Sequence, residues 1–202
     1  MKQTTIKVGP ADNGRRMSLA DFEFAEVVPG YHYELERGVI IVSDVPNLPH
    51  FVQVNAIRFQ LTAYALANPG QIFAVAGGAE CKLLVPEFDS ERHPDLAIFK
   101  TSPPGSDSTT WRKYLPEIVI EVVSASSEAR DYRTKRDEYL AVGIREYWIF
   151  DAEQEEMLVL RRRGKRWVEE RIRPPKTYAS RQLPGLDFDC GAVFAAARAV
   201  PD

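Results

Sequence analysis

Apolar residues recur at two different spacings along the chain, and the change of spacing separates predicted helices from predicted strands. From Pro49 to about Ala67 they recur roughly at helical spacing, and the segment NPG follows, which predicts one long amphipathic helix. The run YHYELERGVIIVSDV, residues 31–45, predicts two strands joined at its RG dipeptide. The runs QIFAVA, AECKLLV and PDLAIFK predict three further short strands.

The second half of the chain places a charged helix between two apolar strands. PEIVIEVVS, residues 116–124, is nearly all apolar apart from its acids, as in a central strand that is buried on both faces. A charged helix from about Ser127 to Val142 follows, and REYWIFD is the next strand. This order predicts a crossover between parallel strands. MLVLRRRGKRWVEERI predicts a hairpin and DCGAVFAAARAV a final helix, so the predicted fold class is α/β (α+β), with a mixed central sheet and helices on two sides.

The chain length and composition favour one packed domain. Its 202 residues are 45% apolar and 27% charged, which is ordinary for a globular protein. We predict a flexible polar arm over residues 1–17 and a single domain over residues 18–202, which opens with a helix start at Ser18. The net charge of −3 argues against a DNA coat protein but is compatible with a nucleic-acid enzyme that has a local positive groove.

Cysteine content and hydropathy predict a cytoplasmic location. Cys81 and Cys190 lie far apart and form no CxxC pattern, which fits a reducing compartment and argues against a disulfide framework. No apolar run reaches the roughly 18 residues that a membrane-spanning helix needs. The first residues also lack the apolar centre of a signal peptide, so we expect no membrane association.

Two acidic residues stand where buried strands should be apolar. Asp95 lies at the start of one predicted strand, and Glu121 lies inside another, between Ile120 and Val122. A buried carboxylate without a partner is costly, so such an acid needs an ion pair, a hydrogen-bond network or a metal ion. If the strands are neighbours, both carboxylates converge at one end of the sheet, where hard oxygen ligands suit Mg²⁺ or Mn²⁺. Buried ion pairs without a metal remain an equally open interpretation.

The charged helix carries Asp131 and Lys135 at a spacing of four residues. Such pairs are common on helix surfaces, where they add a few tenths of a kcal/mol. The position of this pair favours a second interpretation, because the helix follows the acidic strand directly. A lysine there would reach over the acids and hold an attacking water or a scissile phosphate.

Several spaced elements together resemble one family. They are PD at residues 94–95, EVVS at 121–124, Asp131, Lys135 and Tyr139 in a D-x3-K-x3-Y pattern, Gly143, EYWIFD, and YELERG at 33–38. This arrangement resembles the Uma-type restriction endonuclease family of the PD-(D/E)xK nuclease superfamily. The resemblance runs from about Ser18 to Phe194.

The resemblance implies a restriction-endonuclease-like core that hydrolyses DNA with Mg²⁺ (or Mn²⁺). Asp95 and Glu121 are then the metal ligands and catalytic acids, and Glu34 is a further catalytic acid. Lys135 matches the catalytic lysine, which in this family has moved to the helix, and would orient or help to deprotonate the water. Val123 occupies the superfamily's usual lysine position. His50, Ser124, Asp131 and Tyr139 are the supporting residues that the resemblance indicates.

The sequence departs from the family pattern at three positions. Ala125 stands where proline is common, and Arg37 and Val39 replace acids that are often present in the first hairpin. None of these departures removes a proposed metal ligand.

Three functions are compatible with these features: a Mg²⁺-dependent DNA endonuclease, a silent nucleic-acid- or protein-binding module of the same fold, and a hydrolase of a small phosphoester. A wide groove with positive rims would favour nucleic acid, whereas a closed pocket would favour a small substrate. RRRGKR, residues 161–166, is a basic hairpin tip that would either contact phosphates or protect a solvated sheet edge. A homodimer is the simplest way to cut both strands of a duplex.

Overall fold

The main structural element is a six-stranded mixed sheet. The computed structural model describes residues 6–106, 110–124 and 127–200. The sheet has the order β12-β11-β10-β9-β8-β5, and only β9 and β10 are parallel among its neighbours. Its strands are β5 (Ala74–Ala76), β8 (Leu96–Phe99), β9 (Ile118–Val122), β10 (Glu146–Asp151), β11 (Glu156–Arg163) and β12 (Arg166–Ile172). The mixed sheet and the predicted parallel crossover are therefore confirmed.

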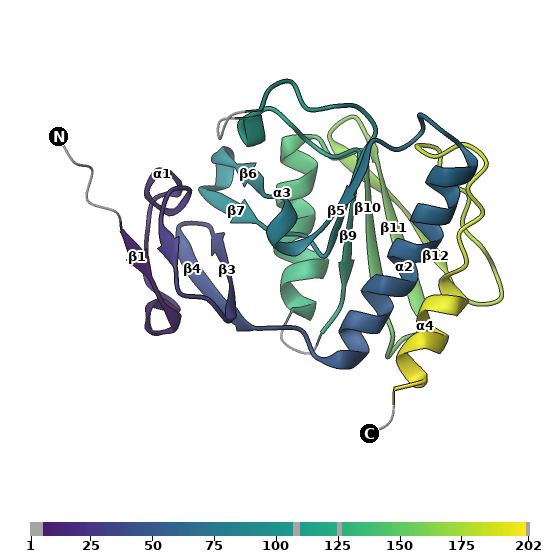
Figure 1. Cartoon of the computed structure of the whole chain (residues 1–202), viewed down its shortest axis with the longest axis horizontal. Helices are drawn as coiled ribbons and strands as arrows, with labels where there is room; N and C mark the ends of the chain where they lie inside the picture. Colours follow the sequence, from purple (N-terminus) through teal and green to yellow (C-terminus); the bar gives the residue numbers. More distant parts are fainter. Residues whose placement is uncertain (1–5, 107–109, 125–126, 201–202) are drawn as a thin grey trace.

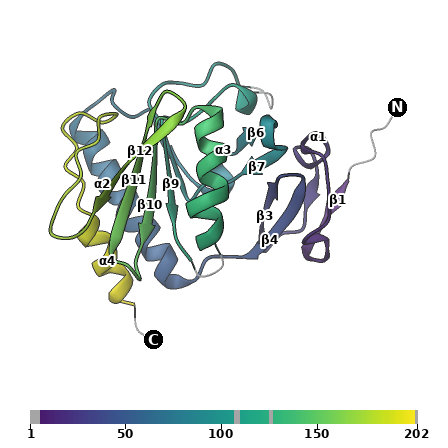
Figure 2. The ribbon, with the colours of Figure 1, turned by 180° about the vertical axis from the view of Figure 1, so that it is seen from behind.

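Helices cover both faces of this sheet. The helices α2 (Leu48–Ala67) and α4 (Cys190–Arg198) lie on one face and α3 (Lys135–Val142) on the other (Figures 1 and 2). The alternation of β9 explains this arrangement, because Ile118 and Ile120 pack with α2 and α4, whereas Val119 packs with Tyr139 of α3. Each fully buried side chain of this size contributes roughly 1.5–3 kcal/mol to folding. Within the described segments, no helix is both long enough and apolar enough to cross a bilayer.

A smaller sheet lies beside the main one and contributes to the pocket described below. Its order is β4-β3-β7-β6, with β3 (Tyr31–Glu36), β4 (Val39–Asp44), β6 (Leu83–Val85) and β7 (Ser90–Arg92). The predicted turn joins β3 to β4 through Arg37 and Gly38, which both have positive φ angles. β7 was not predicted because its sequence, SER, is entirely polar. It is buried because Ser90 and Arg92 bind Glu138 of α3.

The N-terminal segment contacts the small sheet. β1 (Lys7–Val8) pairs with β2 (Glu26–Val27), and a short helix, α1 (Leu19–Phe22), begins at the predicted cap Ser18. The Oδ1 atom of Asn13 accepts a hydrogen bond of 3.0 Å from the backbone N–H of Val42. The described part of the predicted arm, residues 6–17, therefore has defined contacts, and the division of the chain into an arm and a single domain stays a prediction.

Gly77 is required by a close approach between two backbone segments. A Cβ atom at Gly77 would lie 2.1 Å from the carbonyl oxygen of Asp95, so no side chain fits without a backbone shift. The neighbouring N–H of Gly78 donates to the carbonyl of Pro94 at 2.9 Å, which holds the two segments together. This approach fixes the position of Asp95, the residue immediately before β8.

We predict that Gly77→Ala lowers the free energy of unfolding by about 2 kcal/mol, because overpacking of this kind costs roughly 1–3 kcal/mol. Urea denaturation measures the change. Gly9→Ala is the matched control, since its Cβ would lie 3.4 Å from Val28, an ordinary contact. Equal stabilities for the two variants would contradict the prediction.

Candidate functional site

The two strand acids lie next to each other at the ends of β8 and β9. Leu96 pairs with Ile120, and this register puts Asp95 beside Glu121. The Oδ2 atom of Asp95 accepts hydrogen bonds from the backbone N–H of Val122 at 2.8 Å and interacts with Nε2 of His50 at 3.1 Å. Its Oδ1 atom has no hydrogen-bond partner among the described residues, so one carboxylate oxygen is available to a ligand.

Lys135 lies against three carboxylates. Its Nζ atom is 3.0 Å from Glu121 Oε1, 3.1 Å from Asp131 Oδ1 and 3.9 Å from Glu34 Oε1. The lysine side chain is only 6% exposed, so these are buried ion pairs and not a surface pair. Tyr139, one turn further along α3, donates a hydrogen bond of 2.6 Å to Glu121. The structure thus brings Asp95, Glu121 and Lys135 together with Glu34, the third predicted catalytic acid.

A π-helical turn precedes the lysine. The sequence predicted one regular helix from Ser127 to Val142, but residues Arg130–Thr134 form a π-helical segment, and the N–H of Lys135 donates to the carbonyl of Arg130. Such turns are uncommon and concentrate at functional sites. Side-chain periodicity does not reveal them, because one extra residue in a single turn leaves the overall pattern helical. Here the turn carries Asp131, which is 1% exposed.

Arg92 is a further site residue, and sequence reasoning missed it. Its side chain is fully buried and forms ion pairs with Glu34 at 3.2 Å, Glu36 at 2.9 Å and Glu138 at 2.7 Å. The backbone N–H of His93 also donates to Glu34 at 3.1 Å. The available signal was an arginine directly before the HPD segment, but only the tertiary contacts reveal its partners.

Charge pairing decides the protonation of Glu34 and Lys135. Burial by itself raises the pKa of Glu34, but the charges of Lys135 and Arg92 outweigh it and lower the pKa to about 2. Burial likewise lowers the pKa of Lys135, but Asp131, Glu121 and Glu34 outweigh it and raise that pKa well above its ordinary value. Lys135 is therefore protonated at neutral pH in the metal-free protein, which favours an electrostatic or orienting role over the removal of a proton from water.

Glu121 has the opposite perturbation. Burial raises its pKa to about 8, and the nearby charges of Asp95 and Asp131 add to the effect of burial, while Lys135 opposes it. Burial also raises the pKa of Asp131. Among the described residues, five carboxyl groups contact the two permanent cations Lys135 and Arg92; they belong to Glu34, Glu36, Glu121, Asp131 and Glu138. The site therefore has excess negative charge, which a further cation would relieve.

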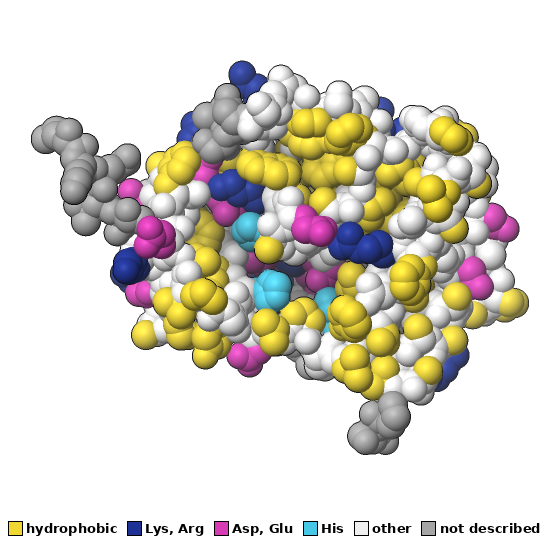
Figure 3. Space-filling model, viewed as in Figure 1, with side chains coloured by type: hydrophobic (Ala, Val, Ile, Leu, Met, Phe, Trp, Pro, Cys, Tyr) yellow, Lys and Arg dark blue, Asp and Glu magenta, His cyan; other side chains and the backbone are white. Residues whose placement is uncertain are grey.

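These residues line a pocket of about 650 Å³ between the small sheet, the start of α2 and the ends of β8 and β9. All three histidines of the chain line it, and Figure 3 shows them around a hollow that also contains acidic side chains. His50 is placed by the first turn of α2, where Asn47 Oδ1 accepts from its backbone N–H at 3.0 Å. The hydrogen bond to Asp95 raises the pKa of His50 against the opposing effect of burial.

Ser124 lines the same pocket at the end of β9. Its backbone N–H and its hydroxyl both donate to Ser127 Oγ, at 3.0 and 3.1 Å, which fixes the turn between the strand and the helix. The neighbouring departure from the family pattern, Ala125, lies outside the described residues. Every predicted site residue with a described side chain thus lies at or beside the pocket, with Asp131 and Tyr139 behind Lys135 and Glu121.

The donor set fits a magnesium ion better than it fits a metal that needs several protein ligands. Within residues 6–106, 110–124 and 127–200, no group of three or more histidine, cysteine or acidic side chains is arranged to hold a metal. Mg²⁺ is commonly bound by one or two carboxylates and keeps several waters. Asp95, whose Oδ1 has no hydrogen-bond partner among the described residues, and Glu121 would supply those two carboxylates. Burial disfavours the ionised form of Glu121, and a bound cation would stabilise that form.

The pocket lacks the positive rim that would indicate duplex DNA most directly. Arg130 and Lys135 are the lysine and arginine side chains of its described lining, and Lys135 is neutralised by its carboxylate partners. Exposed Tyr31 offers an aromatic face at the mouth. Recognition of a nucleic acid here would depend on stacking and metal–phosphate contacts more than on a basic groove.

Comparison with known proteins identifies one family and one fold. The model of the Uma2 family, described as "Putative restriction endonuclease", matches residues 19–191. The chain also resembles a crystal structure from Anabaena variabilis described as "a putative nuclease belonging to DUF820". The TM-score is 0.71 at 16% identity over 90% of this chain and 99% of that chain, which establishes a common fold. No curated protein matches the chain.

We predict that the metal-free protein loses stability as the pH rises from 4.5 to about 8, because the folded state binds a proton at Glu121 that the unfolded state releases near 4.5. This contribution is fully present below pH 4.5 and is lost through pH 8. Glu121→Gln removes the proton-binding group, so its stability relative to wild type should increase across this window. Urea denaturation in EDTA at several pH values measures the difference.

The exposed Glu87→Gln is the matched control for this experiment, and its stability relative to wild type should not change with pH. A Glu121→Gln difference that is flat across the window would show that burial does not perturb this carboxyl group.

Proposed function

Since the chain belongs to the Uma2 family, we propose that it is a metal-dependent endonuclease that hydrolyses DNA phosphodiester bonds at this pocket. The observation that carries the proposal is the meeting of Asp95, Glu121 and Lys135, which come from three separate segments. A structural ion pair would need one acid for the lysine. This site has several, and it leaves Asp95 Oδ1 open to the pocket.

Asp95 and Glu121 would hold Mg²⁺ or Mn²⁺. When bound, the ion supplies charge that polarises the phosphate and lowers the pKa of an attacking water. His50 and the N–H of Val122 both bind Oδ2 of Asp95, so they orient the carboxylate with its other oxygen toward the ligand. Tyr139 does the same for Glu121 through its 2.6 Å hydrogen bond. His50, Val122 and Tyr139 therefore act as positioning residues.

Lys135 would stabilise the negative charge that develops on the phosphate and orient the water by hydrogen bonding. Its raised pKa supports this role and argues against the alternative in which it removes a proton. Asp131, at 3.1 Å, anchors the ammonium group from the π-helical turn, and Ser124 fixes the turn between β9 and the helix through Ser127. Glu34 is paired with Arg92 and lies 3.9 Å from Lys135, so its contacts favour positioning of the lysine over direct metal binding.

A hydrolase of a small phosphoester is the second candidate, and the shape and charge of the pocket favour it. A volume of about 650 Å³ accommodates a small ligand, and the lining carries few free cations for a long polyanion. The homodimer predicted from the sequence stays a prediction, because it concerns a second copy of the chain.

We predict that the protein nicks plasmid DNA in Mg²⁺ or Mn²⁺, and that Asp95→Asn and Lys135→Met each reduce the rate about 100-fold or more. Loss of one preorganised electrostatic group at a reaction centre costs roughly 10²–10³ in rate. Asp187→Asn, an exposed acid outside the pocket, is the matched control and should retain full activity. Gel quantification of nicked and linear plasmid gives the rates.

Equal nicking by wild type and Asp95→Asn would identify a contaminating nuclease and end the proposal. Hydrolysis of bis(p-nitrophenyl) phosphate without DNA cleavage, abolished by Asp95→Asn, would favour the second candidate. Circular dichroism checks that Lys135→Met folds, because removal of one partner of a buried ion pair costs roughly 3–5 kcal/mol.

We also predict that Mg²⁺ raises the melting temperature of the wild type at pH 8, since a ligand that binds only the folded state stabilises it. The ion would balance the excess carboxylates near Glu121. Asp95→Asn should abolish the increase, and Asp187→Asn should leave it intact. Differential scanning fluorimetry in EDTA and in Mg²⁺ measures this effect independently of catalysis, and a wild type that does not respond would argue against the metal site.

A further inference from the structure

A second pocket lies at the opposite end of the parallel strands from the candidate active site. Glu146 at the start of β10 pairs with Ile118 at the start of β9, whereas Glu121 lies toward the other end of β9 and pairs with Ile149. The pocket encloses about 270 Å³. It shares no lining residue with the pocket around Asp95, so a ligand here would be independent of the proposed nuclease centre.

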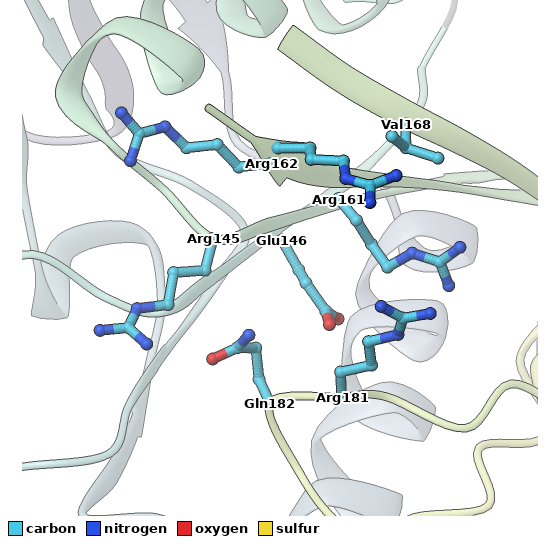
Figure 4. Close-up of a pocket in the computed structure, with 8 residues that line it drawn as sticks. Arg145, Glu146, Arg161, Arg162, Val168, Arg181 and Gln182 are labelled. Atoms are coloured by element: carbon cyan, nitrogen blue, oxygen red, sulfur yellow. The ribbon is translucent and has the colours of Figure 1, made fainter. Parts of the chain in front are cut away.

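Five arginines line this second pocket: Arg145, Arg161, Arg162, Arg163 and Arg181. Arg161 forms an ion pair with Glu170 at 2.7 Å. The other four form no ion pair with any described residue, and all four are exposed. The basic hairpin tip noted in the sequence supplies three of the five, and the loop that carries Arg181 brings another to the same place (Figure 4). Arg161 and Arg181 lie on the side of the pocket that holds Glu146, whereas Arg145 points away from them (Figure 4). An anion here would therefore meet the guanidinium groups of Arg161 and Arg181, with Glu146 as the neighbouring carboxylate.

The pocket also contains one buried acid with a free oxygen. Glu146 is 1% exposed, and its Oε2 atom accepts hydrogen bonds from Trp148 Nε1 at 2.9 Å, Tyr178 OH at 3.1 Å and Ser180 Oγ at 3.0 Å. Its Oε1 atom is buried and has no partner among the described residues. Figure 4 shows the carboxylate directed into the space between Gln182, Arg181 and Arg161. A buried acceptor without a donor is costly, so it is suited to a donor from a ligand.

We propose that this arginine pocket binds a nucleotide, with guanidinium groups on its phosphate and Glu146 Oε1 accepting a hydrogen bond from its sugar or base. Guanidinium groups bind phosphate oxygens in a bidentate way, which suits the unpaired arginines. Inorganic phosphate would satisfy the arginines but would bring its own negative charge toward the carboxylate. A nucleoside phosphate carries both the anion and the hydroxyl or N–H donor, and a pocket of about 270 Å³ is near the lower size limit for small-ligand sites.

The ligand could be a free nucleotide or the 5′-phosphorylated end of a nucleic acid, which present the same chemistry. Isothermal titration calorimetry in EDTA distinguishes them with five probes: adenosine 5′-monophosphate, adenosine, inorganic phosphate, a short oligonucleotide with a 5′-phosphate, and the same oligonucleotide without it. We expect the monophosphate to bind at least about tenfold more tightly than adenosine or phosphate. The double variant Arg163→Ala/Arg181→Ala should bind the monophosphate at least about tenfold more weakly than wild type, as expected for the loss of charge-assisted hydrogen bonds.

Two variants separate this proposal from general electrostatic attraction. Arg16→Ala removes an exposed arginine on the small sheet, outside this pocket, and should leave binding unchanged. Glu146→Gln should narrow the preference for the monophosphate over inorganic phosphate several-fold, because the repelling charge is lost. Tighter binding of the 5′-phosphorylated oligonucleotide than of the monophosphate would identify a nucleic-acid end as the ligand.

The proposal would be overturned if neither phosphorylated probe bound, or if the double arginine variant bound as tightly as wild type. If Glu146→Gln left the preference for the monophosphate over inorganic phosphate unchanged, the role assigned to the carboxylate would be wrong. The result of this binding experiment is independent of whether the wild type nicks plasmid DNA, because EDTA is present and the proposed catalytic residues line the other pocket.

Discussion

A buried network of ion pairs around Lys135 and Arg92 connects the layers of this fold. Lys135 from α3 reaches acids on β9 and β3, and Arg92 from β7 reaches acids on β3 and α3. Transfer of each charge out of water costs several kcal/mol, and mutual pairing offsets this cost only while every partner is in place. The small sheet is therefore joined to α3 and the main sheet by this network, together with the apolar cluster in which Leu83 and Val85 pack against Tyr139.

The same network determines the chemistry of the pocket. Its carboxylates outnumber its permanent cations, which holds Lys135 protonated and disfavours ionisation of Glu121. A purely structural network would be expected to balance its charges, whereas this one leaves an excess of acids, and Oδ1 of the adjacent Asp95 has no hydrogen-bond partner among the described residues. That imbalance is the physical reason for proposing a divalent cation, and it accords with the family to which the chain belongs.

Charge is divided between the two ends of the parallel strands. Acids gather where β9 ends, and arginines gather where β10 begins, with Glu146 buried beneath them. Neither gathering is visible in the net charge of −3, because the two nearly cancel in the total. A weakly acidic protein can in this way carry one site that attracts cations and another that attracts phosphates.

The sequence by itself determined the order and type of most elements, since periodicities of 2 and 3.6 reflect which faces are buried. It also singled out Asp95 and Glu121, because acids inside or beside an apolar strand require partners, and Lys135, because its helix directly follows the acidic strand; the structure places the three side chains close together. Tertiary structure alone decided the rest. The strand that carries Arg92 has no apolar pattern, the π-helical turn changes the helix by one residue, and the arginine pocket combines a hairpin tip with a distant loop. Each depends on contacts between segments far apart in the chain, and a local pattern contains no record of such contacts.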